Sequence, residues 1–521
     1  MIITQDPGLV SGSQGQACSP RPAAGILNAR RRSAASRLPS SCELTQASSA
    51  MEDVMGVEKE PIWKRSGCIT FPFPFPAGDA GAIVTADGLD RAVLNTRSAY
   101  STRAQLLNQF ADAFLQLAPE FTTLLQAETG RTKDVAQMEV HWSVLWLRHP
   151  ASQVLPHQVL QDEDKEVTVR YEPRGVVAAV CPWNCPIMIA FGKIAPALAV
   201  GNCVIVKPAP STPYTSLKCI ELAQSIFPPG VLRVLADDGH LGPLLVDHPG
   251  IAHISFTGST PTGKKIMEAA SKTLKKVTLE LGGNDAAIIL PDVDIEKVAP
   301  QVAMGAWWNS GQSCIATKRV YIHESIYERF LRALVEFTRS YVTVGCSSVD
   351  GATMLGPIQN KMQYQKLRDL IEDCRREGCN FSLDQPLTAQ EDLVRQSLES
   401  GFFLWPMIVD NPPAGSPLVT EEQFGPIIPC MSFSDIEAVI SAANSTSAGL
   451  SASVWGEDAK ATQRIADSLD VGTVFVNGPS RPDPRVPFSG HKESGIGVEY
   501  GLMGLIEYCQ VKSVVKYRAS S

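Results

Sequence analysis

The stretch Phe256-Thr257-Gly258-Ser259-Thr260-Pro261-Thr262-Gly263 is the most informative for the architecture, because it joins an apolar segment to a glycine turn and then to the amphipathic segment 264–274. Glycine lets a backbone approach a phosphate closely, and a helix N-terminus offers free N–H groups with partial positive charge. A strand, turn and helix in this order favour a pyrophosphate site at Gly258, Ser259 and Gly263. The same pattern also occurs in tight turns that bind nothing, so it indicates a pyrophosphate site only together with other motifs of the chain.

Short apolar segments alternate with helical ones on both sides of this turn. Strands separated by helices form parallel sheets through βαβ units. The sequence therefore predicts an α/β protein with two doubly wound, Rossmann-like domains, which fits a length of 521 residues. We expect strands at 176–180, 203–206, 231–235, 254–256, 278–281, 286–290, 320–322 and 473–476, with helices after Ile187 and Pro213.

The composition limits the class of partner. A net charge of -8 argues against a nucleic-acid surface, since phosphate binding needs clustered Lys and Arg. The 13 cysteines show neither CxxC pairs nor zinc-type spacing, so we expect no metal and a reducing compartment, namely the cytoplasm. The longest apolar run, 187–200, is interrupted by Lys193 and is too short to span a bilayer. A small-molecule partner fits best, with no nucleic acid and no membrane.

Residues 1–55 differ from the rest of the chain. They are rich in Ser, Ala and Arg, including Arg30-Arg31-Arg32, poor in acidic residues and without hydrophobic periodicity in the first 50 positions. Such a composition does not offset the entropy cost of ordering, which predicts disorder. It also suits an organellar transit peptide, so a mitochondrial location is the alternative to the cytoplasm.

Two stretches contain residues suited to covalent chemistry. Cys314 closes the segment Trp307-Trp308-Asn309-Ser310-Gly311-Gln312-Ser313-Cys314, where a loop leaves a helix and enters a sheet, a suitable place for a nucleophile. Glu280 ends an apolar strand in Leu279-Glu280-Leu281-Gly282-Gly283-Asn284, and desolvation should raise its pKa toward that of a general base. The alternatives are a buried structural cysteine and a rim glutamate paired with a surface cation.

Two further stretches offer polar groups at strand ends. Asn184, in Pro182-Trp183-Asn184-Cys185-Pro186, could donate its amide to a developing oxyanion. Lys207 follows the strand 203–206, and open α/β sheets bind ligands at the carboxyl ends of their strands. Together with the glycine turn, Lys207 indicates a cofactor crevice.

These motifs resemble a known family. PWNCP, KPA, FTGSTPTG, LELGGN, GQSC, EEQFGP and PFSGHKESG occur in the order typical of the NAD(P)-dependent aldehyde dehydrogenase superfamily. The resemblance covers roughly Leu106 to Tyr517, and the 34-residue spacing from Glu280 to Cys314 (314 minus 280) matches that between base and nucleophile.

The resemblance implies a set of site residues. Cys314 would attack an aldehyde, Asn184 and the Cys314 N–H would hold the oxyanion, and water activated by Glu280 would hydrolyse the thioester. Lys193 and Glu499 would orient groups or relay protons around Glu280. Cofactor-binding positions implied by the resemblance are Trp183, Lys207, Pro208, Gly258, Ser259, Gly263, Gly282, Glu422 and Phe424.

The resemblance also implies a domain organisation. Residues 56–150 and 174–275 would form the dinucleotide-binding domain, and residues 276–485 the catalytic domain. Residues 151–173 and 500–518 would form a small β oligomerisation arm, in which a hairpin from His157 to Glu172 pairs with a strand from Tyr508 to Tyr517. A homodimer or homotetramer is expected.

Two positions depart from the family pattern. Asn284 follows the double glycine, where the family usually has Lys. Pro210 stands three positions after Lys207, where NAD-preferring relatives carry an acidic residue that repels a 2′-phosphate. No dedicated Arg for that phosphate is visible, so we predict that NAD and NADP are both used.

The substrate pocket is predicted to be wide. Cys185 and Gly192 occupy positions where relatives often carry large aromatic residues. Arg481 and Arg485 lie in the expected entrance loop and could pair with a carboxylate on a semialdehyde or a bulky oxygenated aldehyde, unless both are simply solvated. The other predicted pocket residues are Met188, Trp308, Ser313, Ile315 and Phe488.

Three alternative functions are distinguishable on sequence grounds. A CoA-acylating relative generally lacks the base, so Glu280 argues against it. A cysteine hydrolase would not need the dinucleotide crevice. A non-enzymatic or binding role on the same fold is disfavoured because the catalytic positions are filled.

Overall fold

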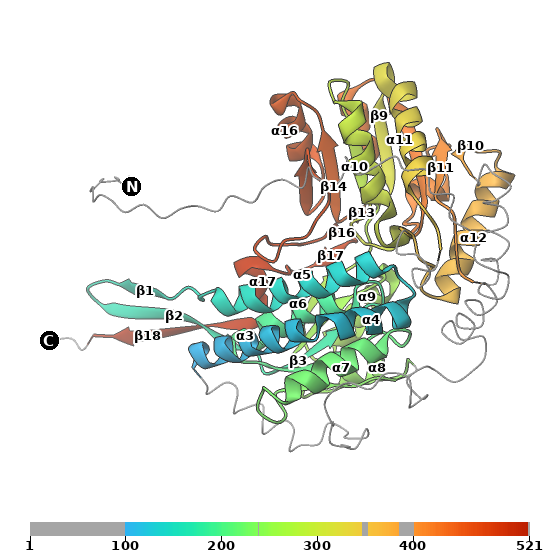
Figure 1. Cartoon of the computed structure of the whole chain (residues 1–521). Helices are drawn as coiled ribbons and strands as arrows, with labels where there is room; N and C mark the ends of the chain where they lie inside the picture. The colour runs from blue at the N-terminus through green and yellow to red at the C-terminus, as the bar shows by residue number, and fades with distance from the viewer. Residues whose placement is uncertain (1–98, 238, 346–352, 385–400, 519–521) are drawn as a thin grey trace, which may run out of the picture. The chain divides into compact units, whose positions relative to one another are not determined.

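The computed structural model describes residues 99–237, 239–345, 353–384 and 401–518 (Figure 1). Our predictions for the N-terminal segment 1–55 and for residues 56–98 of the first domain lie outside these ranges. Of the helices that the structure describes, none combines the length and apolar character needed to cross a bilayer.

The first sheet has six strands in the order β17-β7-β6-β3-β4-β5. The strands from β7 to β5 run parallel, and β17 joins β7 in the antiparallel sense. Every residue of β4 and β6 is buried, as expected for a parallel sheet with its central strands enclosed. The strands are β3 (Val176–Val180), β4 (Cys203–Lys207), β5 (Leu232–Val234), β6 (His253–Thr257), β7 (Lys276–Glu280) and β17 (Gly495–Ile496).

The predicted boundary at residue 275/276 is therefore wrong. β7 pairs with β6, with Glu280 opposite Thr257, so the strand that carries Glu280 belongs to the cofactor-type sheet. The sequence shows β7 as an apolar segment but does not show which sheet it joins, because both neighbouring strands are equally apolar.

Helices pack around this sheet through apolar faces. In α3, Leu107, Phe110 and Phe114 are buried at three- and four-residue spacing, which places them on one face of the helix, whereas Leu115 is exposed. Helix α6, which is buried along its whole length, contacts α3, α5 and α7. The helices are α3 (Tyr100–Gln116), α4 (Ala118–Thr129), α5 (Lys133–Ser152), α6 (Pro186–Ala199), α7 (Pro213–Gln224), α8 (Leu241–Asp247), α9 (Thr260–Ser271) and α17 (Gly501–Glu507).

The second sheet has seven strands in the order β10-β11-β12-β9-β8-β14-β15. All neighbours are parallel except β10 and β11. The strands are β8 (Ala286–Ile289), β9 (Arg319–His323), β10 (Asn380–Leu383), β11 (Met407–Asp410), β12 (Ile427–Phe433), β14 (Ser451–Trp455) and β15 (Thr473–Val476). Its helices are α10 (Ile295–Trp307), η2 (Trp308–Gly311), η3 (Glu324–Ile326), α11 (Tyr327–Tyr341), α12 (Lys361–Arg376), α14 (Pro417–Thr420), α15 (Ile436–Asn444) and α16 (Ala459–Ser468).

Four strands of this sheet, β10, β11, β12 and β14, were not among those expected from the sequence. β12 follows Gly425-Pro426 and contains Pro429, and such residues normally mark turns or sheet edges. The predicted strands near 286–290, 320–322 and 473–476 are present as β8, β9 and β15.

A third, three-stranded antiparallel sheet has the order β1-β2-β18 (Figure 1). β1 (Gln158–Gln161) and β2 (Lys165–Pro173) form the predicted hairpin, and β18 (Cys509–Tyr517) pairs with β2 along its whole length. The first part of the predicted 500–518 arm is helical. This part is α17, which packs on α5 and α6, and the strand begins after it. The short strands β13 (Ala448–Gly449) and β16 (His491–Lys492) form a separate pair.

Candidate active site

A cavity of about 180 Å³ gathers most of the predicted catalytic and pocket residues. Its polar groups include the side chains of Asn184, Glu280 and Cys314, which come from a loop after β3, the end of β7 and the loop before β9. The remaining wall is mostly apolar. The cavity is lined by Met138, Trp142, Asn184, Cys185, Met188, Ile189, Glu280, Met304, Gly305, Trp308, Ser313, Cys314, Ile315, Ala316, Pro479, Ser480, Arg481, Pro482, Phe488 and Tyr500.

The backbone before Cys314 is unusually constrained. Asn309, Ser310 and Gly311 all have positive φ, at 52°, 57° and 72°. A Cβ on Gly311 would collide with the carbonyl of Gly425, so only glycine fits there. For the two non-glycine residues, Asn309 and Ser310, such backbone strain costs about 1–3 kcal/mol each, and it persists where the surrounding structure fixes a functional group.

Charged neighbours and burial set the ionisation of the two reactive groups. Burial, with a contribution from Glu499, raises the pKa of Glu280 to about 7, while Lys193 and the Cys314 thiol act in the opposite direction. The Oε1 atom of Glu280 has no hydrogen-bond partner among the described residues. Burial and then Glu280 raise the pKa of the Cys314 thiol, and the Lys318 ammonium opposes them.

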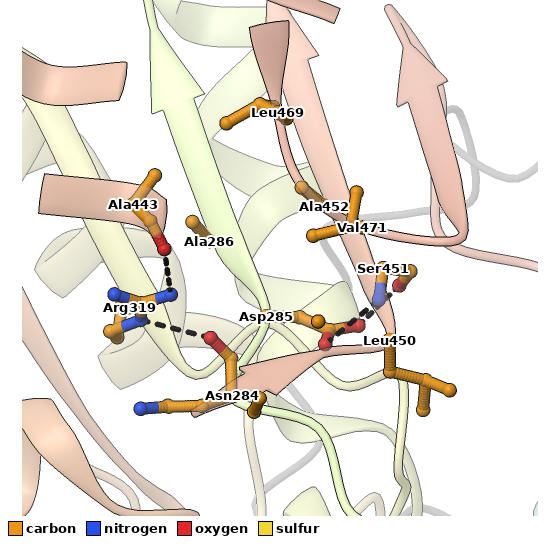
Figure 2. Close-up of a pocket in the computed structure, with 12 residues that line it drawn as sticks. Asn284, Asp285, Ala286, Arg319, Ala443, Leu450, Ser451, Ala452, Leu469 and Val471 are labelled. Carbon is orange, nitrogen blue, oxygen red and sulfur yellow. Dashed lines mark hydrogen bonds between the residues drawn. The ribbon is translucent and has the colours of Figure 1, made fainter. Parts of the chain in front are cut away.

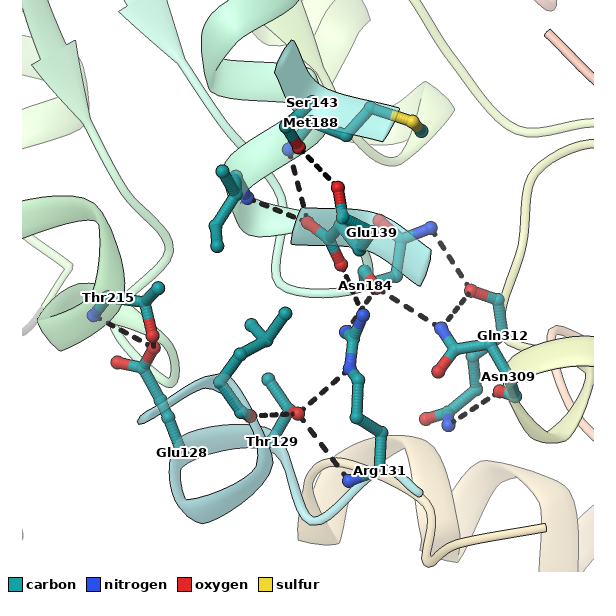
Figure 3. Close-up of polar contacts among 12 residues, drawn as sticks. Glu128, Thr129, Arg131, Glu139, Ser143, Asn184, Met188, Thr215, Asn309 and Gln312 are labelled. Atoms are coloured by element: carbon teal, nitrogen blue, oxygen red, sulfur yellow. Dashed lines mark hydrogen bonds and ion pairs between the residues drawn. The ribbon is translucent and has the colours of Figure 1, made fainter. Parts of the chain in front are cut away.

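A buried network fixes Asn184, as Figure 3 shows. The Asn184 carbonyl accepts hydrogen bonds from Arg131 Nη2 (2.5 Å) and Asn309 Nδ2 (3.1 Å), and its Nδ2 donates to the Gln312 carbonyl (3.1 Å). Arg131 in turn pairs with buried Glu139, whose Oε1 accepts the first free N–H groups of α6. The loop that carries Asn184 is thereby tied to the turn that carries Cys314.

Lys193 and Glu499 form a buried ion pair beside Glu280. Lys193 Nζ donates to a carboxylate oxygen of Glu499 and to Ser255 Oγ at 3.1 Å. The two side chains are 0% and 3% exposed. Such a pair is costly to break, because removal of one partner leaves a buried charge without compensation.

Lys318 is another buried cation, and its role was not predicted from the sequence. Its Nζ donates to the carbonyls of Ser313 (2.9 Å) and Cys314 (2.6 Å) and lies 3.4 Å from Glu422 Oε1. Asn284 makes other contacts. Its side-chain Nδ2 donates a hydrogen bond to the Val419 carbonyl. Its backbone carbonyl accepts a hydrogen bond from Arg319, as Figure 2 shows. Lys318 therefore places a cation next to Glu422 in a chain that has Asn at the usual lysine position.

Glu422 packs against the double-glycine turn. Its Oε1 accepts a hydrogen bond from the Gly283 N–H at 3.1 Å, and a Cβ on Gly282 would collide with its carboxylate. Phe424, which has a φ of 57°, meets the Trp183 ring edge-on at 5.3 Å. Predicted cofactor residues from both sheets thus lie side by side.

The glycine turn after β6 has the predicted form. Ser259 lies at the N-cap of α9, and its Oγ is 3.0 Å from Thr262 Oγ1. A Cβ on Gly263 would lie 2.6 Å from Leu281 Cδ2, so this glycine allows close packing of helix and strand. Gly258 and Ser259 therefore lie between a strand end and a helix start, where an anion is favoured.

Lys207 ends β4, with Pro208 directly after it, and is not alone. Its Nζ donates to the Pro208 carbonyl and lies 3.3 Å from Asp237 Oδ1. An acidic side chain therefore stands near Lys207, although position 210 holds proline. Asp237 follows β5, the neighbouring strand, and its proximity depends on strand order rather than on spacing along the chain.

The prediction that Gly192 widens the pocket is also wrong. Gly192 does not line the cavity, because Tyr500 occupies the space in front of it: a Cβ on Gly192 would lie 2.8 Å from the Tyr500 ring. Tyr500 stacks on Phe488, with ring centroids 6.0 Å apart, and meets Trp146 edge-on. Cys185 does line the cavity, as predicted.

The two entrance arginines differ. Arg481 lines the cavity and lies over the Trp142 ring at 5.0 Å, in cation–π geometry. Arg485 is outside the lining and pairs with Asp483 at 2.5 Å.

A strained cysteine turn, a buried carboxyl group and an amide share one cavity beside a parallel, doubly wound sheet, and this arrangement suits an α/β enzyme. Comparison with known proteins makes the class specific. The profile of the aldehyde dehydrogenase family matches residues 90–514. The chain belongs to the aldehyde dehydrogenase family and is an enzyme that oxidises aldehydes.

Individual relatives agree with this assignment. The chain is 48% identical over 423 residues to aldehyde dehydrogenase LUC3 of Fusarium, covering 81% of this chain and 88% of the relative. It is 36% identical over 432 residues to phenylacetaldehyde dehydrogenase of Pseudomonas fluorescens, covering 80% and 83%. The structure of betaine aldehyde dehydrogenase from Staphylococcus aureus in complex with NAD+ aligns with a TM-score of 0.76 and 29% identity, covering 82% and 86%.

Proposed function

We propose that the protein oxidises an apolar or aromatic aldehyde to its carboxylic acid and reduces NAD(P)+, with Cys314 as nucleophile and Glu280 as base. The observation that carries this proposal is the single cavity shared by Cys314, Glu280 and Asn184. Its walls include Trp142, Trp308 and several methionines, which suit a ring or a hydrocarbon body.

The chain's own groups account for addition to the aldehyde. Glu280 accepts the thiol proton, the Cys314 sulfur bonds to the carbonyl carbon, and the C=O π electrons move to oxygen. The Asn184 Nδ2 and the Cys314 N–H donate to that oxyanion. A nicotinamide bound beside Cys314 would supply the hydride acceptor, and loss of hydride from the carbon would leave a thioester on Cys314.

Hydrolysis then requires an ionised base. The Lys193–Glu499 pair, buried beside Glu280, is the relay through which Glu280 releases the first proton. Glu280 next takes a proton from water, the hydroxyl bonds to the acyl carbon, and the C–S bond breaks to give the acid and the Cys314 thiolate. A CoA-acylating route is disfavoured because this base lies on the cavity.

The residues present fit a dinucleotide. Ser259 and its neighbours at the start of α9 suit the pyrophosphate, and Lys207 with Asp237 suits the adenosine ribose. Glu422, held by the Gly283 N–H and Lys318, suits the nicotinamide ribose.

The reaction is tested by absorbance at 340 nm after mixing the protein with NAD or NADP and phenylacetaldehyde, a linear aliphatic aldehyde or a semialdehyde. We expect the highest kcat/KM with phenylacetaldehyde. No reduction of either nucleotide with any of these aldehydes would refute the proposed function.

We also propose that the arm joins copies of this chain. β18 is an end strand of its sheet, and Val511, Val515 and Tyr517 on it are 62%, 44% and 77% exposed. Exposed apolar strand edges of this kind pair with another chain. Light scattering after gel filtration should give a dimer or tetramer, and a monomer after deletion of residues 509–521.

A further inference from the structure

The carboxyl ends of β4 and β5 bring one cation and one carboxylate together. Lys207 Nζ and Asp237 Oδ1 are 3.3 Å apart, and their side chains are only 8% and 16% exposed. The Leu241 N–H donates to Asp237 Oδ2, which fixes the carboxylate. Although burial alone raises the pKa of Asp237, the Leu241 amide and the Lys207 ammonium hold it below its ordinary value, so the group is negative at neutral pH.

The order of the strands places this pair beside the expected cofactor crevice. The chain runs from β3 to β4 and β5 on one side, then crosses to β6 and β7 on the other. The topological switch point therefore lies between β3 and β6, where doubly wound sheets bind dinucleotides at the carboxyl ends. In such folds an acidic residue at the end of the second strand accepts the ribose hydroxyls. Here the second strand, β4, ends in Lys207, and the neighbouring strand β5 leads to an acidic residue.

We propose that Asp237 selects NAD over NADP, as the acidic member of an adenosine-ribose subsite shared with Lys207. The inference rests on the proposed use of a nicotinamide dinucleotide. An ammonium donor next to a carboxylate acceptor matches a vicinal diol, which both donates and accepts hydrogen bonds. A 2′-phosphate would bring about two negative charges to a fixed carboxylate and would also compete for Lys207.

This assignment goes further than the prediction that NAD and NADP are both used. That prediction considered the loop after β4, where Pro210 carries no charge. Asp237, in the segment that follows β5, provides the repulsion instead, so the same selectivity is reached from a position after a different strand.

The test measures nucleotide binding, independently of turnover. NADH and NADPH fluorescence titrations give the two dissociation constants for the wild type, Asp237→Asn and Asp237→Ser. Asp247→Asn is the matched control, because Asp247 makes the same kind of lysine pair, with Lys272 at 3.7 Å, on an exposed surface. Thermal unfolding of each variant verifies that it is folded.

We expect the wild type to bind NADH at least ~30-fold more tightly than NADPH, a ratio within the range that one fixed repulsive charge supplies. Either Asp237 variant should reduce the ratio to below ~5-fold, mainly by tighter NADPH binding, and Asp247→Asn should leave it unchanged. An unchanged ratio in both folded Asp237 variants, or equal binding by the wild type, overturns the role of Asp237 but not the proposed function. Failure to bind either nucleotide overturns both.

Discussion

Replacement of the buried carboxyl group of Glu280 should make stability less sensitive to pH. Its pKa is about 7 in the folded protein against an ordinary value of 4.5. Between these values the unfolded chain has lost the proton that the folded chain retains, so the free energy of unfolding falls as pH rises. A difference of about 2.5 in pKa corresponds to about 3 kcal/mol of the free energy of unfolding. This stability is fully lost above pH 8 and fully retained below pH 4.5.

Glu280→Gln keeps the shape of the side chain but cannot ionise. We therefore expect the melting temperature of the variant to match that of the wild type near pH 4.5 and to exceed it by several degrees at pH 8.5. Differential scanning fluorimetry across this range measures the difference, with Glu268→Gln on the exposed face of α9 as control. If the melting temperatures of variant and wild type differ by the same amount at every pH, or if the variant is more stable only at acid pH, Glu280 is not a destabilised buried carboxylate.

Substitutions at three further residues test the walls of the cavity and the buried Lys318. Lys318→Met should lower the free energy of unfolding by about 3 kcal/mol. It should also slow iodoacetamide labelling of the Cys314 peptide at pH 8, because the cation that favours the thiolate is gone. Unchanged labelling, measured by mass spectrometry, would refute this. Arg481→Ala should reduce kcat/KM for a semialdehyde about 10-fold, roughly 1.4 kcal/mol, and leave phenylacetaldehyde unaffected; equal losses would exclude a carboxylate contact. Tyr500→Ala should open the space before Gly192 and improve kcat/KM for bulky over small aldehydes, whereas Tyr500→Phe should not; the same substrate profile in both variants would contradict this.

Local sequence patterns predicted much of the fold. The strand, turn and helix around Gly258 are present as β6 and α9. These elements depend on burial periodicity and on glycine at a turn, both of which act over a few residues. The same is true of the turn before Cys314. The hairpin and C-terminal strand of the arm, which only the family resemblance implied, are present as β1, β2 and β18.

The misses concern partners that are distant in sequence. Asn184 is held by Gln312, 128 residues away, and Tyr500 fills the space in front of Gly192 from the far end of the chain. The sequence around Asp237 and Lys318 contains no motif that predicts their roles, because each is a single charged residue beside a strand. Their roles emerge only when strand order brings β5 beside β4 and the Cys314 turn beside Glu422.

The assignment of nucleophile and base is tested most directly by stopped-flow and intact-mass measurement on Glu280→Gln. On mixing with phenylacetaldehyde and NAD, we predict a burst of about one NADH per subunit that is slower than in the wild type, because Glu280 no longer accepts the thiol proton. Steady-state turnover should be reduced much further, and an acyl adduct should be found on the Cys314 peptide. Cys314→Ala should show neither burst nor adduct while still binding NADH. Equal loss of burst and steady state in Glu280→Gln, or an adduct on another residue, would contradict the account.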